Sequence, residues 1–426
     1  MVTEEKIRLS MTWLCSLPFY HVFSNSSGKY GACCLDNTGT VPANDVPIMD
    51  WFLGEEMQNL RLEMLGLKEG TETIDARCST CRRVESEGGI SERMKWCDRD
   101  LDHRNKPTKN DFYKDSKAHR QLIKDTIEEF IWNNHHMVIA GRLIDLKVRM
   151  FGNLCNLSCY MCQPKNSSTR FKDIIQLTDY TDQFNMGQPN YDKRGELVDQ
   201  YIEQISEFSN LLGSITFTGG EPTMMDVHFR LLDYLIESKD CYDITLHYQT
   251  NLTKLTSKVT KYFKYFKHVY ISASVDSYGV YNDYIRYGSQ WDDIISKIKM
   301  VQNTSNVSVC INPTISMLSV IQYEEFLNTI KEYVELDYVI PHVLHTPRFL
   351  AARHLPAEIK ESLISSLEPF KRKTKGIYKI VNELEQSRDD ELFRQGINYC
   401  TSLDQLYNRE EGLFYHWPEL RKHING

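Results

Sequence analysis

Residues 143–162 read Leu-Ile-Asp-Leu-Lys-Val-Arg-Met-Phe-Gly-Asn-Leu-Cys-Asn-Leu-Ser-Cys-Tyr-Met-Cys. The first part, residues 143–151, is short, apolar and β-branched, which predicts a buried strand. The loop that follows carries Cys155, Cys159 and Cys162. Three thiolates within eight residues can reach three corners of one iron–sulfur cube and leave the fourth iron open. A zinc site would need a fourth ligand, and the next Cys or His is the distant His228.

Strand-like and helix-like segments alternate after this loop. Their regular alternation predicts an α/β fold in which a parallel sheet curves into a partial (β/α)6 TIM-like barrel. In such folds the chemistry lies at the carboxyl ends of the strands. The strands are expected at 143–151, 213–217, 244–249, 268–274, 307–315 and 338–344, and the helices at 169–176, 226–238, 256–266, 291–304 and 321–333.

Polar residues follow these strands where a barrel would place its site. Thr218-Gly219-Gly220-Glu221-Pro222 comes directly after the second strand, Thr250-Asn251 after the third and Ser274-Val275-Asp276 at the end of the fourth. Arg286 lies twelve residues beyond Ser274. Each of these residues alone would be an ordinary turn, cap or surface residue, and their common position at strand ends singles them out.

The cysteine spacing after a first strand, together with these strand-end residues, resembles the radical S-adenosylmethionine (radical SAM) superfamily. The resemblance implies that Cys155, Cys159 and Cys162 bind a catalytic 4Fe–4S cluster. Gly219, Gly220 and Glu221 would hold the methionine amino group of S-adenosylmethionine, and Arg286 its carboxylate. Asn251, Ser274 and Asp276 match further cofactor-binding positions. The aromatic residue that often precedes the third cysteine, near the adenine, is replaced here by Met161.

The resemblance also implies a reaction. An external one-electron reductant of the flavodoxin or ferredoxin type would reduce the cluster, S-adenosylmethionine would be cleaved, and the 5′-deoxyadenosyl radical would abstract hydrogen from a substrate carbon. The substrate class expected is a peptide, a protein or a small molecule. An RNA or nucleotide substrate is the alternative within this enzyme class.

The N-terminal cysteines suggest a second metal centre. Cys15, twelve residues, Gly28, four residues and Cys33 precede a Cys78-Ser-Thr-Cys81 knuckle, which is a strong metal-ligand signal. A zinc ribbon is one interpretation. The order of these residues also resembles the twitch/SPASM auxiliary domains of radical SAM enzymes, which implies a second 4Fe–4S cluster on Cys15, Cys33, Cys78 and Cys81. Cys34 competes with Cys33 for one ligand position.

Length and composition complete the expectations. The 426 residues divide into an N-terminal twitch-like domain (1–100), a linker and helix (101–140), the barrel (141–350) and a helical C-terminal extension (351–426). Residues 51–67 are expected to form one amphipathic helix. The net charge of −8 argues against nucleic acid, and twelve cysteines with no apolar leader or membrane span predict a cytoplasmic protein. A zinc-binding module with two sites and no catalysis is the competing hypothesis.

Overall fold

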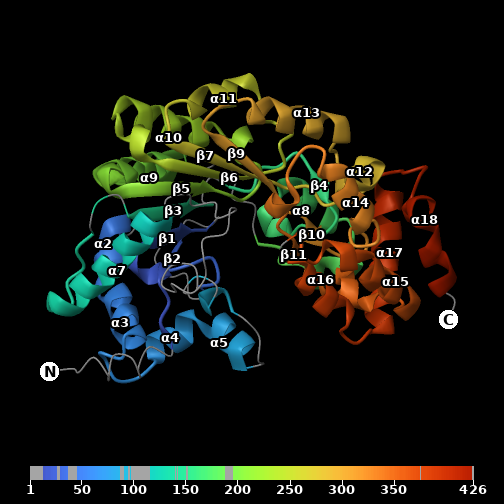
Figure 1. Ribbon diagram of the computed structural model, residues 1–426, viewed down its shortest axis with the longest axis horizontal. Helices are drawn as coiled ribbons and strands as arrows, with labels where there is room; N and C mark the ends of the chain where they lie inside the picture. The colour runs from blue at the N-terminus through green and yellow to red at the C-terminus, as the bar shows by residue number, and fades with distance from the viewer. Residues whose placement is uncertain are drawn as a thin grey trace.

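A computed structural model of the chain places its elements in space (Figure 1). It describes residues 13–25, 29–36, 46–86, 91–94, 96, 116–139, 141, 143–149, 152–187, 195–374 and 376–424. Gly28, Cys97 and most of the expected linker lie outside the described residues.

A seven-stranded sheet runs through the middle of the molecule, and its strands lie in the order β2-β1-β3-β5-β6-β7-β9. All neighbours from β1 to β9 are parallel, while β2 is antiparallel to β1. The parallel sheet predicted from the alternating pattern is therefore confirmed. The strands are β1 (His21–Ser24), β2 (Tyr30–Gly31), β3 (Ile144–Val148), β5 (Leu212–Phe217), β6 (Thr245–Thr250), β7 (His268–Ala273) and β9 (Val307–Ile311).

The sixth expected barrel strand continues the sheet more loosely. Val339 forms a parallel bridge with Ile311 at the end of β9. Beyond it, β11 (His342–Val343) pairs in parallel with β10 (Thr314–Ile315). The expected strand at 338–344 is thus present as a bridge followed by a two-residue strand.

Helices connect the strands and cover the sheet. In Figure 1, α10, α11 and α13 lie along one face of it. Their buried apolar residues, such as Leu231, Val259 and Ile298, belong to one continuous core with the strands. The connecting helices are α8 (Ser168–Ile174), α9 (Gly195–Glu207), α10 (Asp226–Glu237), α11 (Ser257–Phe263), α12 (Gly279–Ile285), α13 (Trp291–Gln302) and α14 (Tyr323–Ile330).

The N-terminal part joins the sheet through a buried polar contact. His21 on β1 meets Asp145 on β3, with 2.7 Å between His21 Nδ1 and Asp145 Oδ2, and Ser214 on β5 donates to the same carboxylate. The N-terminal strands therefore extend the central sheet beyond β3. The helices of this part are α2 (Ile48–Leu53), α3 (Glu55–Met64), α4 (Glu72–Arg77), α5 (Ser79–Ser86) and α7 (Ser116–Trp132).

The single helix expected at 51–67 is wrong, because α2 and α3 are separate helices that meet at Gly54. Gly54 has extended backbone, with ψ of 170°, and so ends one helix and begins the next. A Cβ there would lie 2.7 Å from the carbonyl oxygen of Asp50. The buried Arg61 guanidinium on α3 donates to the carbonyls of Pro18 and Phe52, which fixes the bend.

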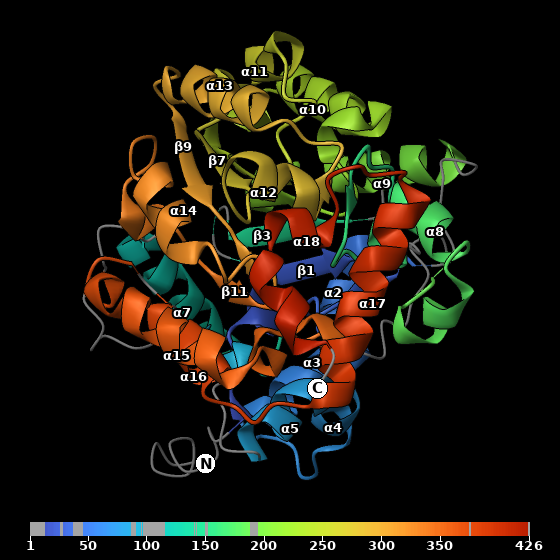
Figure 2. The ribbon, with the colours of Figure 1, turned by 90° about the vertical axis from the view of Figure 1, so that its right-hand side faces the viewer.

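The C-terminal segment forms a layer of helices against the side of the barrel, facing the viewer in Figure 2. Trp417 is fully buried there and packs against Tyr281 and Tyr284 of α12. The helices are α15 (Ala357–Leu367), α16 (Ile377–Leu384), α17 (Asp390–Leu406) and α18 (Leu413–His416). Across the described part of the chain, no helix combines the length and apolar character that a membrane crossing needs.

Candidate active site

The cysteine loop is held at the carboxyl ends of the strands by a two-residue antiparallel pairing. Ser158 and Cys159 form a two-residue strand, β4 (Ser158–Cys159), antiparallel to β8 (Arg286–Tyr287), so Cys159 lies opposite Arg286. The backbone N–H of Cys155 donates to Ser168 Oγ at 3.2 Å, at the start of α8. The first and second cysteines are thus fixed from two directions.

The three thiols lie within electrostatic reach of one another. Burial raises the pKa of Cys155 to about 12, and the Cys159 and Cys162 thiols add to that rise. Burial likewise raises the pKa of Cys162 to about 12, again with a contribution from Cys159. Burial also raises the pKa of Cys159, while the Arg286 cation opposes the rise. Without a bound cation these thiols would stay protonated, so a metal centre is what would stabilise them as thiolates.

The Gly-Gly-Glu segment after β5 packs on the backbone just before Cys155. The Glu221 N–H donates to the Leu154 carbonyl at 2.7 Å, and the Gly220 N–H donates to the Asn166 carbonyl at 3.0 Å. Gly220 has φ of +48°, and a Cβ on it would lie 2.3 Å from the Leu154 carbonyl oxygen. Only glycine allows this approach. The second strand end and the cysteine loop are therefore one packed unit.

The Glu221 carboxylate is buried and satisfied within the chain. Its Oε1 accepts from the hydroxyls of Thr223 at 2.6 Å and Thr250 at 2.8 Å, and its Oε2 accepts from the N–H of Asn251 at 2.8 Å. Burial raises the pKa of Glu221, and these hydrogen bonds oppose the rise. In this structure the side chain ties the ends of β5 and β6 together.

Asn251 reaches the cysteine loop directly. Its Nδ2 lies 3.7 Å from Cys155 Sγ and donates to Asn156 Oδ1 at 3.3 Å. Ser274 follows β7, and its N–H donates to the Thr250 carbonyl. The strand-end residues predicted from the sequence therefore meet at one edge of the sheet, beside the first cysteine.

Arg286 is committed to two partners in this structure. It forms a buried ion pair with Asp276, at 2.7 Å between Nε and Oδ2, and its Nη1 lies 3.6 Å from Cys159 Sγ. Asp276 Oδ1 also accepts from the N–H of Thr314 at 2.7 Å. Met161 is buried beside Cys162. Arg286 and Asp276 thus brace the second cysteine from the barrel side.

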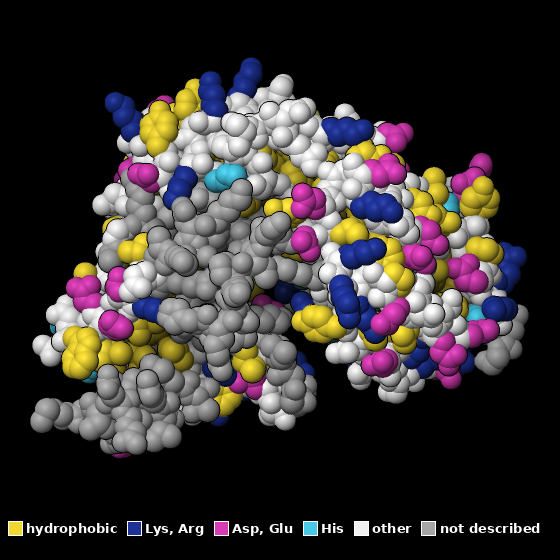
Figure 3. Space-filling view, viewed as in Figure 1, with side chains coloured by type: hydrophobic (Ala, Val, Ile, Leu, Met, Phe, Trp, Pro, Cys, Tyr) yellow, Lys and Arg dark blue, Asp and Glu magenta, His cyan; other side chains and the backbone are white. Residues whose placement is uncertain are grey.

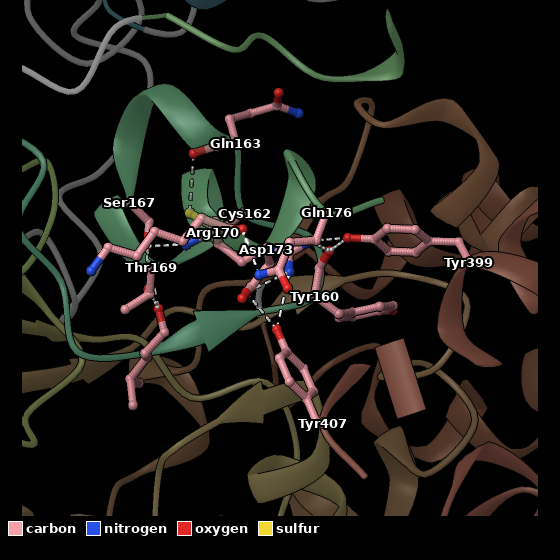
Figure 4. Close-up of polar contacts among 12 residues, drawn as sticks. Tyr160, Cys162, Gln163, Ser167, Thr169, Arg170, Asp173, Gln176, Tyr399 and Tyr407 are labelled. Atoms are coloured by element: carbon pink, nitrogen blue, oxygen red, sulfur yellow. Dashed lines mark hydrogen bonds and ion pairs between the residues drawn. The ribbon is translucent and has the colours of Figure 1, made fainter. Parts of the chain in front are cut away.

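The structure adds a clamp on the loop that the sequence did not reveal (Figure 4). Tyr399 on α17 donates to the carbonyl of Tyr160 at 2.8 Å, and the buried Arg170 on α8 donates both to that carbonyl and to the Tyr399 hydroxyl. Tyr407 donates to Asp173 Oδ2, the ion-pair partner of Arg170. The C-terminal helices therefore hold the backbone between the second and third cysteines.

The N-terminal cysteines come together in part. The Cys78 thiol interacts with the thiols of Cys33 and Cys81, and burial raises its pKa to about 12. Cys15 is buried, and the carbonyl of its neighbour Leu14 accepts from Arg93, whose charge acts on Cys78. Cys34 is exposed on the turn after Cys33.

Within the described ranges, no three His, Cys, Asp or Glu side chains are placed so that they could hold a single metal ion. This holds for the cysteines of the loop and for the N-terminal cysteines. Thiols alone make up both groups, and thiolates are the ligands that iron–sulfur clusters take. His228 does not complete a zinc site at the loop. It is buried between aromatic rings, with its Nε2 2.8 Å from the Tyr248 hydroxyl.

Comparison with known proteins agrees with this geometry. The model of the Radical SAM superfamily matches residues 150–336, the segment that carries the three cysteines and the strand-end residues of the site. No curated protein matches the sequence.

Several solved structures resemble the chain. Native anSMEcpe with bound AdoMet is 16% identical with a TM-score of 0.39, over 57% of this chain and 64% of that one. Streptococcus suis SuiB bound to S-adenosylmethionine is 13% identical with a TM-score of 0.36, over 80% and 67%. SuiB bound to its precursor peptide SuiA is 16% identical with a TM-score of 0.31, over 86% and 68%. The chain thus spans less than two thirds of the first of these structures.

Proposed function

We propose that the chain, through the radical SAM domain of residues 150–336, cleaves S-adenosylmethionine reductively and abstracts hydrogen from a peptide, protein or small-molecule substrate. The observation that carries this proposal is the meeting of three coupled thiols with the Gly-Gly-Glu backbone and Asn251 at one sheet edge. That arrangement leaves one corner of a four-iron cluster for a small chelating ligand.

Each site residue has a distinct task in this proposal. Cys155, Cys159 and Cys162 would hold three irons of the cluster. The Gly219–Gly220 backbone, positioned by Glu221, would bind the methionine amino group, and Ser274 with the Asp276–Arg286 pair would bind its carboxylate. Asn251, whose Nδ2 lies 3.7 Å from Cys155 Sγ, would orient that cysteine, and Met161 would contact the adenine. The cluster and S-adenosylmethionine supply one-electron reduction of the sulfonium and a 5′-deoxyadenosyl radical that takes a hydrogen atom from a substrate carbon.

The protein's own contribution is electrostatic and steric. Two cations stabilise negative charge on the thiolates. Arg286 lies beside Cys159, and Arg170 contacts the loop backbone at the Tyr160 carbonyl. The C-terminal clamp holds the loop backbone between the second and third cysteines, and Cys159 is buried, while Cys155 and Cys162 are partly exposed. An external reductant of the flavodoxin or ferredoxin type would supply the electron, in the cytoplasm.

The second part of the proposal concerns the N-terminal cysteines. The coupling of Cys33, Cys78 and Cys81, with Cys15 in the same buried region, supports an auxiliary 4Fe–4S cluster of the twitch type. With four thiolates such a cluster would act in electron transfer or in structure.

Anaerobic reconstitution tests both parts. We expect about eight irons and eight sulfides per chain, for two four-iron clusters, and 5′-deoxyadenosine release when dithionite is added. Two tightly held zinc ions with no cleavage of S-adenosylmethionine would contradict the proposal. Loss of four irons in a Cys78→Ala/Cys81→Ala variant, with the remaining cluster intact, would support the assignment of the auxiliary ligands.

A further inference from the structure

A groove separates the N-terminal helices from the C-terminal segment. It consists of two adjoining cavities of about 840 and 650 Å³ that share Val84, Glu92, His345 and Arg353. Helix α5 forms one wall, and residues 341–354 with α16 form the other. Figure 3 shows the indentation between the lower-left and right-hand parts of the molecule, with Lys and Arg side chains at its rim.

The walls of the groove carry more positive than negative charge. Arg83, Arg348, Arg353 and Lys379 line it, against the carboxylates Glu92 and Glu383. Arg353 and Glu383 form two hydrogen bonds of 2.8 Å and neutralise each other. Arg348 is exposed and forms no ion pair with any described residue. In a chain of net charge −8, the exposed Arg348 in this wall favours an anionic occupant.

A buried histidine lines the same wall. His354 Nδ1 accepts a hydrogen bond of 3.2 Å from the N–H of Asp389. Burial, with Arg353, lowers the pKa of His354, so this ring adds no positive charge to the groove at pH 7. The positive charge of the wall therefore comes from its arginine and lysine side chains.

One edge of the groove is an open strand. The N–H groups of His342 and Leu344 donate to the carbonyls of Pro313 and Ile315, at 2.9 Å each. The intervening Val343 therefore points its N–H and C=O away from β10, and in the described part of the chain neither makes a hydrogen bond. Val343 lines the groove. An extended peptide can pair with such an edge.

The lining also distinguishes a peptide from a nucleic acid. Single-stranded nucleic acids bind through aromatic side chains on which their bases stack. Among the described residues that line the groove there is no Phe, Tyr or Trp. Together with the positive charge and the open strand edge, this lining favours a peptide over a single-stranded nucleic acid.

We propose that this groove binds an extended acidic segment of a peptide or protein substrate, through Arg348 and its neighbouring cations and through backbone pairing at Val343. The proposal rests on the proposed function, and it names the substrate class for the same enzyme. Cys81 lines the groove, so the bound segment would pass directly beside the proposed auxiliary centre.

The groove borders the N-terminal cysteines at a second point. Leu35 lines it and follows Cys34 in the chain, and its N–H lies 3.4 Å from Cys33 Sγ. A segment bound in the groove would therefore lie close to Cys33 as well as to Cys81.

Fluorescence anisotropy with the reconstituted holoenzyme tests the groove. The probe is a labelled decapeptide of alternating glutamate and valine, and we expect it to bind. Arg348→Glu should weaken binding about tenfold because it reverses a charge in the groove. Arg372→Glu is the matched control, since Arg372 is exposed, lies outside the groove and undergoes the same charge change. Methylation of alternate peptide nitrogens should also weaken binding.

Several outcomes would overturn the proposal. These are equal binding of a lysine–valine decapeptide, equal losses in Arg348→Glu and Arg372→Glu, and tighter binding of an oligothymidylate of matched charge. Formation of 5′-deoxyadenosine without peptide should be unchanged in Arg348→Glu. Failure of peptide binding with S-adenosylmethionine cleavage intact would refute the groove alone, and loss of cleavage with peptide binding intact would refute the proposed function alone.

Discussion

Alanine substitutions at Gly220 and at Gly279 together separate the cost of backbone strain from the cost of steric overlap at the catalytic loop. Gly220 has φ of +48°, and Gly279, at the start of α12, has a nearly equal φ of +51°. A left-handed backbone costs a residue with a Cβ about 1–2 kcal/mol. Both substitutions bear that cost, so any difference between them comes from what the new methyl group meets.

The surroundings of the two glycines differ sharply. A Cβ on Gly279 has no neighbour within 4 Å, whereas on Gly220 it would lie 2.3 Å from the Leu154 carbonyl oxygen and 2.8 Å from the Asn153 carbonyl carbon. These are backbone atoms and cannot swing aside. Overpacking of this kind adds about 1–3 kcal/mol. We therefore expect Gly220→Ala to lower the free energy of unfolding by about 3 kcal/mol and Gly279→Ala by about 1 kcal/mol.

Urea denaturation of both variants measures this difference, and iron content after reconstitution measures its consequence. Because Leu154 directly precedes Cys155, Gly220→Ala should also lose iron, while Gly279→Ala should retain it. Equal losses of stability in the two variants, or full iron content in Gly220→Ala, would refute the packing of the Gly-Gly-Glu backbone on the cysteine loop.

Two further predictions concern residues that support the site. Tyr399→Phe removes one hydrogen bond to the Tyr160 carbonyl and one from Arg170, so it should lower the free energy of unfolding by about 3 kcal/mol. Tyr415 is exposed, and Tyr415→Phe should change that free energy by less than about 0.5 kcal/mol. Similar urea midpoints for the two variants would contradict the clamp. Burial lowers the pKa of His228 to about 3 in the folded state, from 6.5, so the unfolded chain takes up the proton first. The contribution of this histidine to the free energy of unfolding should be complete above pH 6.5 and should fall by about 2 kcal/mol at pH 5. His228→Phe should remove that part of the pH dependence. If the free energy of unfolding of His228→Phe changed with pH as it does in the unmodified chain, the buried ring would not be the cause.

Local patterns account for most of what the sequence predicted. The five central strands and their helices follow from short apolar runs and helical periodicity, and the strand-end residues meet because parallel strands end at one edge of a sheet. The cluster loop was likewise predicted from a local pattern, the spacing of Cys155, Cys159 and Cys162. Gly54 was missed as a helix break because glycine inside an amphipathic pattern is often tolerated.

Long-range contacts explain the rest. β1 pairs with β3 across more than a hundred residues, through His21 and Asp145, and no spacing rule reveals such a pairing. Tyr399 and Arg170 are 229 residues apart, and each alone is an ordinary helix residue. The groove at Val343 likewise depends on segments that are distant in the chain. These features depend on tertiary packing, which the local periodicity does not encode.

In the proposed function, three cysteines on one loop hold a cluster that cleaves S-adenosylmethionine. The most direct test is 5′-deoxyadenosine formation by anaerobically reconstituted protein with dithionite, compared with the Cys155→Ala/Cys159→Ala/Cys162→Ala variant and with Cys400→Ala, a buried cysteine on α17. We expect product from the unmodified chain and from Cys400→Ala, and none from the triple variant. Continued cleavage by the triple variant would contradict it.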